Sequence, residues 1–234
     1  LKKWNLYEKS KKNNMTKIPV YMMPGLAASS RIFENIILDE ALFEVVWLDW
    51  MMPLPNESLV NYSKRFIAQK IHHANPVLIG VSFGGIIVQE MARLIPVHKV
   101  IIISSVSSEQ DFPKRMKWAK ATKLYKIIPT RLAKHFGLLA KIAPSKKVKN
   151  RIQLYRKYLS VNDTAYLDWA LDKIINWKAK PIQAPLIHIH GTYDAVFPIQ
   201  YITSNYLPIR HGTHIMILNR YRWFNQHLPA IILE

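Results

Sequence analysis

Apolar residues in this chain fall mostly into short runs that are separated by segments with helical spacing. Six runs have the length and the Val, Ile and Leu content of buried strands, at 18–23, 43–50, 76–81, 97–105, 185–191 and, more weakly, 206–209. Helical spacing marks 57–73, 82–95 and 216–232, with Pro76, Pro96 and Pro229 at or near their ends. This alternation predicts an α/β fold, a mostly parallel sheet of about six strands with helices on both faces.

The segment between the fourth and fifth predicted strands, residues 107–180, has a different character. It is rich in lysine, poor in strand patterns and punctuated by prolines, and Trp118, Ala121 and Tyr125 recur at i, i+3 and i+7. This spacing predicts a helix with an apolar stripe flanked by lysines. We expect 18–106 and 181–234 to form the core. Residues 107–180 would then be a helical lid over the carboxyl ends of the strands, where open α/β sheets bind ligands.

The charge is unevenly distributed along the 234 residues. The net charge of +18 divides into +5 in residues 1–17, +13 in residues 107–180 and zero in the remainder. A charge this high is typical of nucleic-acid binders, so its location matters: the chain is a neutral protein that is interrupted by a basic insert and preceded by a basic tail. We expect 1–17 to be a basic N-terminal extension, of which residues 1–14 precede the first methionine, Met15.

Composition excludes several classes of protein. The chain is 50% hydrophobic and 11% aromatic, which is enough for a sizeable core and excludes wholesale disorder. It has no cysteine, which excludes disulfide scaffolds, thiolate metal centres and cysteine nucleophiles. No uncharged apolar run approaches the length of a membrane span, and the basic start lacks the apolar stretch of a signal peptide. These features predict a cytoplasmic protein.

A serine between glycines is the sharpest chemical signal. Ser82 lies in the sequence GVSFGG (80–85), between a predicted buried strand and a predicted apolar helix. A tight strand-to-helix turn of this kind exposes the serine hydroxyl, and its flanking glycines supply the space that the turn needs. The helix N-terminus beside it offers free N–H groups to a developing oxyanion. An ordinary glycine-rich turn is the alternative interpretation.

A serine hydroxyl needs a base to become a nucleophile, and the base needs an orienting acid. Asp194 follows the fifth strand within HGTYDAVFP (190–198), and His214 follows the sixth within RHGTHIMILNR (210–220). The chain order Ser, Asp, His is one known arrangement of a catalytic triad.

These motifs together resemble those of a lid-bearing serine hydrolase of the α/β-hydrolase superfamily, similar to esterases and lipases. The resemblance covers about 18–232 and rests on PGLAAS (24–29), GVSFGG, HGTYDAVFP and GTHIMILNR. It implies Ser82 as the nucleophile, His214 as the general base and Asp194 as the orienting acid. It further implies an oxyanion hole made by the backbone N–H groups of Leu26 and Phe83. Two features depart from the family: the sheet begins at Ile18 without the usual opening hairpin, and MPGL lacks a histidine before its glycine.

Other residues could take some of these roles. His211 is an alternative base, and Asp111, just past the fourth strand, is an alternative acid. His188 and His190 share one face of a strand and could form a zinc site with the two later histidines, although the ligand spacing matches no known metal motif. We interpret His190 as a structural histidine and expect neither metal nor cofactor. Asp168 and Asp172 are expected on a solvated helix face, and packing is the expected role of four tryptophans, Trp47, Trp50, Trp169 and Trp177.

The sequence therefore predicts a serine hydrolase that cleaves a carboxylic ester, or a similar acyl bond, through an acyl-enzyme. A thioesterase, an amidase or a C–C hydrolase could use the same triad. A basic nucleic-acid- or membrane-binding protein without catalysis is the alternative from a different class, as is a metal-dependent hydrolase. The basic insert favours an anionic acyl substrate or a weak association with an anionic membrane surface, unless its lysines serve only solubility. No specific nucleic-acid partner is expected.

Overall fold

The computed structural model describes residues 16–127 and 157–234. Most of the predicted N-terminal extension and the middle of the insert, 128–156, lie outside this range. The six predicted strands are all present. Their bounds are β1 Ile18–Met23, β2 Phe43–Trp47, β3 Val77–Val81, β4 Lys99–Ile103, β5 Leu186–Gly191 and β6 Leu207–Ile209.

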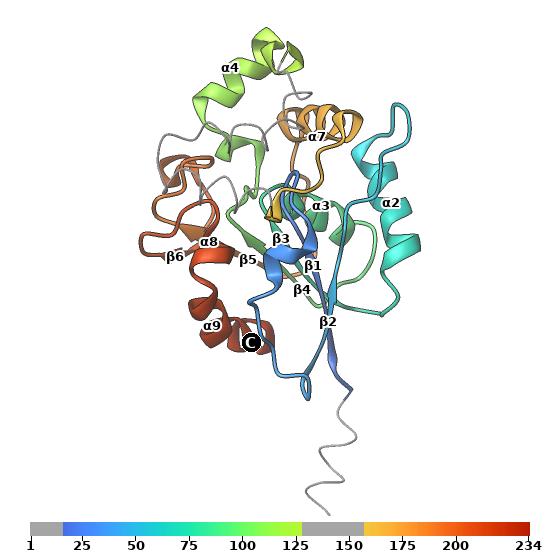
Figure 1. Ribbon diagram of the computed structural model, residues 1–234, viewed down its shortest axis with the longest axis vertical. Helices are drawn as coiled ribbons and strands as arrows, with labels where there is room; N and C mark the ends of the chain where they lie inside the picture. Colours follow the sequence, from blue (N-terminus) through green and yellow to red (C-terminus); the bar gives the residue numbers. More distant parts are fainter. Residues whose placement is uncertain (1–15, 128–156) are drawn as a thin grey trace, which may run out of the picture.

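The strands form one parallel sheet in the order β2-β1-β3-β4-β5-β6 (Figure 1). The chain order reverses between β1 and β3, which are neighbours with Met22 beside Ile79 and Met23 beside Gly80. At such a switch point the connections leave the sheet towards opposite faces, and a crevice opens at the carboxyl ends of the strands. The sheet topology therefore locates the site at the ends of β1 and β3.

Helices cover both faces of the sheet, as the sequence predicts. One face packs against α2 (Leu59–Lys70) and α3 (Phe83–Ala92), and the side chains of α3 are buried throughout. The other face packs against η1 (Ser30–Phe33), α8 (Met216–Asn219) and α9 (Tyr221–Leu233). Alternate residues of each strand enter the two cores, so that Leu78 lies in the first and Val77 and Ile79 in the second.

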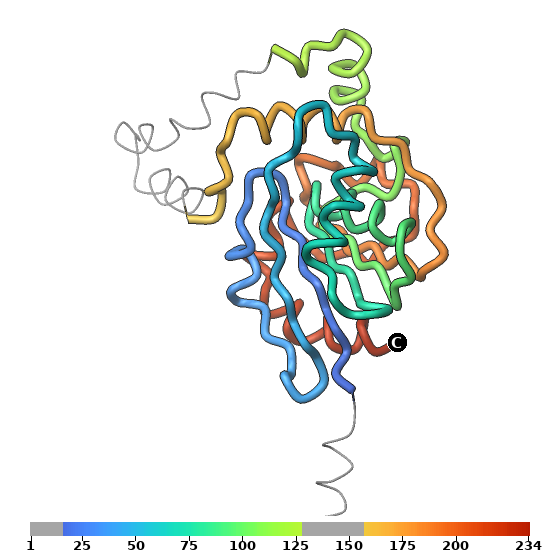
Figure 2. Tube along the Cα trace, turned by 90° about the vertical axis from the view of Figure 1, so that its right-hand side faces the viewer, coloured from blue at the N-terminus to red at the C-terminus, as the bar shows by residue number. Residues whose placement is uncertain are grey.

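Several helices lie within the described parts of the insert. They are η2 (Glu109–Asp111), α4 (Lys114–Thr122), η3 (Leu124–Ile127) and α7 (Thr164–Asn176), and a further short helix, η5 (Ile199–Tyr201), follows β5. Both α4 and α7 lie beyond the carboxyl ends of the strands, as the two views in Figures 1 and 2 agree. Helix α7 is capped by Asp163, whose side chain accepts a hydrogen bond from the Tyr166 amide, and it buries Tyr166, Trp169 and Ile174.

The prediction of an apolar stripe on the first helix of the insert is wrong. Helix α4 has no buried residue, and 61% of Trp118 is exposed. The helix ends at Thr122 because Lys123 adopts a left-handed conformation, with φ of 58°, and Tyr125 therefore lies on η3. The i, i+7 spacing from Trp118 to Tyr125 thus spans two separate elements.

Two other expectations also need correction. The closing helix does not end near Pro229; α9 continues through it to Leu233, and the break in 216–232 falls at Arg220 instead. Proline costs one backbone hydrogen bond, whereas Phe224, Leu228 and Ile232 hold the helix against the core. Trp47, which was expected to pack, is 43% exposed because β2 is an edge strand.

Within the described residues, the helices are too short or too polar to cross a membrane.

Candidate active site

Ser82 occupies a strained turn between β3 and α3. Its φ of 52° and ψ of −117° lie outside the regions that L-residues favour, as the strand–serine–helix pattern predicts. The turn is held by the Ser82 amide, which donates to the Ile103 carbonyl at 2.9 Å. The Ser82 carbonyl accepts from the Ser105 hydroxyl at 2.7 Å. These bonds hold a backbone that would otherwise relax, and strain of this kind is typical of functional sites.

The glycines of the turn are required by close backbone contacts. A Cβ on Gly80 would lie 2.3 Å from the Gly84 carbonyl oxygen, so the strand and the helix could not approach. A Cβ on Gly84 would lie 2.4 Å from the carbonyl oxygens of Met23 and Pro24. The second glycine therefore lets α3 begin directly against the end of β1.

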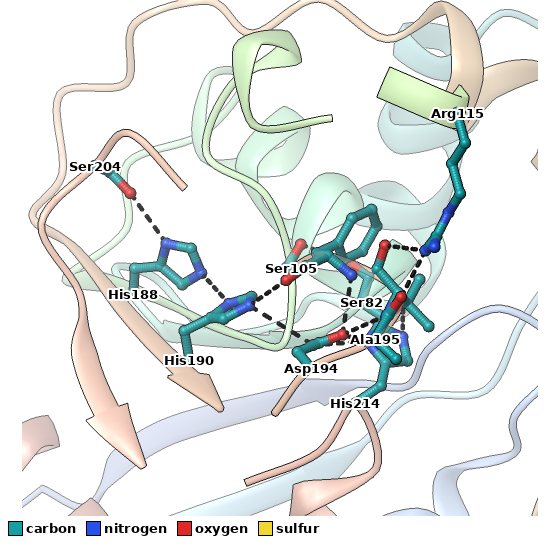
Figure 3. A network of polar contacts seen from close by, with 11 residues as sticks. Ser82, Ser105, Arg115, His188, His190, Asp194, Ala195, Ser204 and His214 are labelled. Atoms are coloured by element: carbon teal, nitrogen blue, oxygen red, sulfur yellow. Dashed lines mark hydrogen bonds and ion pairs between the residues drawn. The ribbon is translucent and has the colours of Figure 1, made fainter. Parts of the chain in front are cut away.

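The structure brings Ser82, His214 and Asp194 together at the carboxyl edge of the sheet (Figure 3). The His214 Nε2 lies 3.0 Å from the Ser82 Oγ, and its Nδ1 lies 2.9 Å and 3.1 Å from the two carboxylate oxygens of Asp194. Because the carboxylate can only accept, Nδ1 carries the proton and Nε2 is free to accept from the serine hydroxyl. This is the geometry of a nucleophile, a base and an orienting acid.

Asp194 is held as a buried anion. Its side chain has no exposed surface, and its Oδ1 accepts from the amides of Val196 at 2.8 Å and Phe197 at 2.9 Å. Burial pushes the pKa of Asp194 upward, but the hydrogen bonds from His214 and the Phe197 amide outweigh it and leave the pKa below its usual value. The acid therefore stays charged where it orients the imidazole.

Two buried histidines support the loop that carries Asp194. His190 Nε2 donates to the Phe197 carbonyl at 2.8 Å, so its Nδ1 must accept from His188 Nε2 at 2.9 Å. His188 Nδ1 in turn accepts from the Ser204 hydroxyl at 3.0 Å. Burial and then the neighbouring His190 lower the pKa of His188 to about 4, and burial also lowers the pKa of His190. Both rings are neutral near pH 7, and His190 acts as a structural histidine, as expected.

The insert contacts the same loop from its other side. Arg115 of α4 donates to the carbonyl oxygens of Ala195 at 2.6 Å and Val196 at 2.7 Å, directly after Asp194 (Figure 3). The first helix of the insert is thus tied to the acid-bearing loop.

The two amides expected to form an oxyanion hole lie on either side of the switch point. Phe83 is the first residue of α3, where no preceding turn supplies an acceptor for its N–H. Leu26 follows Gly25 in the loop after β1, and a Cβ on Gly25 would lie 3.3 Å from the Ser82 Cβ. The loop after β1 therefore lies directly beside the serine.

The alternative acid and base lie elsewhere. Asp111 is buried, but its carboxylate accepts from Thr203, Ser107 and Ser108, so that it joins the start of the insert to the segment after η5. His211 packs edge-on against Tyr193, at 4.7 Å between ring centroids. Neither has a hydrogen bond to the Ser82–His214 pair within the described residues.

The remaining candidates divide between the core and the surface. Trp169 and Trp177 are buried, as expected, and Trp50 is half-buried. Asp168 is exposed, but Asp172 accepts from the Tyr125 hydroxyl at 3.0 Å and so ties α7 to η3 instead of lying free on a solvated face. Across 16–127 and 157–234, no cluster of three or more His, Asp or Glu side chains is suited to a metal ion.

Several residues of this site were not found by sequence reasoning. Ser105 holds the serine turn, Arg115 and Phe197 hold the acid loop, and His188 fixes the tautomer of His190. Ser105, Arg115 and His188 lie outside the motifs quoted above, whereas Phe197 lies within HGTYDAVFP but acts through its backbone amide. The one usable signal was the alternation of His188 and His190 on a buried strand, which placed them on a common face but did not reveal their partners.

Comparison with known proteins identifies the fold. No protein-family model and no curated protein sequence matches the chain. Among solved structures, it is similar to the protein BpoC of Mycobacterium tuberculosis, with a TM-score of 0.71, 16% identity and coverage of 94% of this chain and 93% of that one. It is also similar to an esterase of Exiguobacterium antarcticum, with a TM-score of 0.68, 19% identity and coverage of 94% of this chain and 93% of that one. For MenH of S. aureus the TM-score is 0.64 and the identity 17%, with coverage of 94% of this chain and 95% of that one. These neighbours are α/β-hydrolase-fold proteins, and the chain accordingly has the α/β-hydrolase fold.

Proposed function

We propose that the protein is a serine hydrolase that cleaves a carboxylic ester or a similar acyl bond through an acyl-enzyme. The observation that carries the proposal is the continuous set of hydrogen bonds from Ser82 through His214 to the buried Asp194. Solved neighbours described as esterases, at 14–19% identity, give it secondary support.

In the acylation step, the Ser82 Oγ attacks the carbonyl carbon of the substrate while His214 Nε2 takes the hydroxyl proton. The new C–O bond forms as the carbonyl π bond opens, which leaves a tetrahedral oxyanion. We assign its stabilisation to the N–H groups of Leu26 and Phe83. The imidazolium formed on His214 is stabilised by the charge of Asp194.

The intermediate collapses when the bond to the leaving oxygen breaks and His214 gives its proton to that oxygen. The alcohol departs, and the acyl group remains on Ser82. A water molecule then attacks the acyl carbon, again with His214 as the base. Collapse of the second oxyanion returns the proton to Ser82 and releases the carboxylic acid.

We propose that the insert, 107–180, is the lid of this site. Its described helices lie over the carboxyl edge of the sheet, and Arg115 contacts the acid loop. A cover of this kind excludes water and shapes the acyl-binding space. Its basic charge favours an anionic substrate or an anionic surface, which salt dependence can test.

The test is turnover of a series of esters and thioesters of increasing acyl length. Wild-type protein should hydrolyse at least one member, and Ser82→Ala should lose that activity down to a small residue that binding and the oxyanion donors still supply. Ser63→Ala is a matched control because it removes another buried hydroxyl, one without a hydrogen bond among the described residues, on α2 and away from the site. It should retain the wild-type rate.

Thioester turnover that exceeds ester turnover at equal acyl length would redefine the enzyme as a thioesterase on the same triad. A Ser82→Ala protein that is folded and as active as wild type would contradict the proposal.

A further inference from the structure

We infer that Trp50 is a positioning residue for the oxyanion hole, and that it sets the spacing between the two donor amides. The inference rests on the proposed function. One indole side chain contacts both segments that carry the donors, the loop after β1 and the start of α3.

The first contact is a hydrogen bond to the loop after β1. The Trp50 Nε1–H donates to the Gly25 carbonyl at 3.0 Å. That carbonyl belongs to the same peptide unit as the Leu26 N–H, because a peptide bond joins the C=O of one residue to the N–H of the next. The peptide unit is planar, with the C=O and the N–H pointing in opposite directions. Fixing the Gly25 oxygen on the indole therefore fixes the direction in which the Leu26 N–H points.

The second contact is a ring stack on the residue after the serine. The indole of Trp50 lies nearly parallel to the ring of Phe83, with centroids 5.0 Å apart and an interplanar angle of 12°. Phe83 is itself buried, so its ring has little room to move. Its backbone N–H is the second proposed donor. The stack thus couples the indole to the start of α3.

The loop after β1 has a strained backbone, which this constraint helps to hold in place. Ala27 has a φ of 63°, a left-handed conformation that costs energy for a residue with a Cβ. The residue before Trp50 acts on the same loop, because the Asp49 carboxylate accepts from the Ser30 amide at 2.9 Å. The segment after β2 therefore holds both ends of a strained loop, at Gly25 and at Ser30.

An oxyanion donor contributes only if it is aimed at the position where charge develops. Loss of one such donor costs on the order of 10²–10³ in kcat, and a misdirected donor should cost a part of that. The oxyanion hole stabilises the oxyanion of the transition state more than it stabilises the ground-state carbonyl. A misdirected donor should therefore lower kcat and leave KM nearly unchanged.

The test compares Trp50→Phe with a matched control, Trp169→Phe. Trp50→Phe keeps an aromatic ring against Phe83 but removes the N–H that reaches Gly25. Trp169 also contacts the Phe83 ring, edge-on at 6.0 Å between centroids, and also donates its indole N–H to a backbone carbonyl, but to that of Glu57 at 2.7 Å and not to that of Gly25. Both variants should lose similar thermal stability. Measured for each are kcat and KM with an active ester, and the inhibition constant of a trifluoromethyl ketone, whose adduct with Ser82 bears an oxyanion.

We expect Trp50→Phe to lower kcat about 10-fold and to weaken ketone inhibition by a similar factor, with KM within about 2-fold of wild type. Trp169→Phe should change kcat and ketone inhibition by less than about 2-fold. Trp50→Leu removes the stack as well and should lose more kcat than Trp50→Phe, provided that thermal unfolding shows it folded.

Failure of this inference is distinct from failure of the proposed function. An active wild type whose Trp50→Phe variant keeps kcat and ketone affinity, or whose two tryptophan variants lose them equally, overturns the positioning role alone. A wild type that hydrolyses no acyl substrate and binds no ketone overturns the proposed function, and the role of Trp50 with it.

Discussion

Arg115 and Ala195 join the basic insert to the loop that carries Asp194. The guanidinium of Arg115 donates to the Ala195 carbonyl at 2.6 Å and to the Val196 carbonyl at 2.7 Å, although 80 residues separate Arg115 from Ala195. The position of α4 and the position of the acid are thus mechanically linked. A shift of α4 should therefore also shift the loop that carries Asp194.

Arg115→Met should lower kcat/KM several-fold, because the acid loop loses two charge-assisted hydrogen bonds and α4 loses its anchor. The exposure of Arg115 makes the effect on the free energy of unfolding small, below about 1 kcal/mol. Lys117→Met is the matched control: it removes one positive charge from the same helix and one bond to a carbonyl, that of Gln110 at 2.8 Å, without touching the acid loop. Equal kinetic losses in the two variants would argue against the link.

The two buried aspartates should behave in opposite ways. Asp194→Asn should reduce kcat by about 10⁴, since an amide no longer fixes the His214 tautomer or stabilises the imidazolium. Asp111→Asn should leave kcat within a few-fold of wild type but cost about 1–3 kcal/mol of stability, because its hydrogen bonds hold Thr203 and Ser107. Steady-state kinetics and denaturant unfolding of both variants measure this. The reverse pattern would move the acid to the position after β4.

Stability should fall in mild acid because of His188. Its folded-state pKa of about 4 lies below the usual 6.5, so the unfolded chain binds a proton more readily between these values. The contribution is complete above about pH 6.5 and is lost as the pH falls towards 4, by up to about 3 kcal/mol. Urea unfolding at several pH values measures the slope. His188→Gln should flatten it, whereas substitution of the exposed His72 by Gln should leave it unchanged.

The charge of the insert should appear in salt dependence. Residues 114–127 include six Lys or Arg and no acid. The Debye length falls from about 30 Å at 0.01 M salt to about 8 Å at 0.15 M. If the charge attracts substrate, kcat/KM for an anionic ester should fall over this range far more than for a neutral ester of equal size.

Reversal of Lys120 and Lys123 to Glu should remove most of that difference. Lys117 is less suitable for reversal because it is hydrogen-bonded to the Gln110 carbonyl. Equal salt responses for the two esters in the wild type, together with no binding to anionic lipid vesicles, would leave the lysines as solubilising surface.

The sequence predicted those features that depend on local pattern. Apolar runs such as 76–81 specify buried strands by themselves. GVSFGG specifies a strained turn because the glycines that the turn requires lie within a few residues of Ser82 in the sequence. The approach of Ser82, Asp194 and His214 was predicted through a family resemblance and chain order, and not from spacing.

The supporting contacts were not predictable because their partners are remote in sequence. Nothing local marks Trp50 as the donor to Gly25, or Arg115 as the donor to Ala195. The same limit explains the errors. Pro229 stays helical because tertiary packing outweighs one missing hydrogen bond. Trp47 is exposed because β2 is an edge strand, and only the strand order of the folded sheet shows this.

The central claim is that the Ser82 hydroxyl is a nucleophile activated by His214. Its most direct measurement is the rate and site of covalent labelling by a fluorophosphonate, with the modified residue identified by mass spectrometry. The account predicts one adduct, on Ser82, at a rate that depends on His214 as the base that accepts the serine proton. His214→Gln should slow the labelling by several orders of magnitude. Absence of an adduct, or an adduct on another residue that persists in Ser82→Ala, would contradict it.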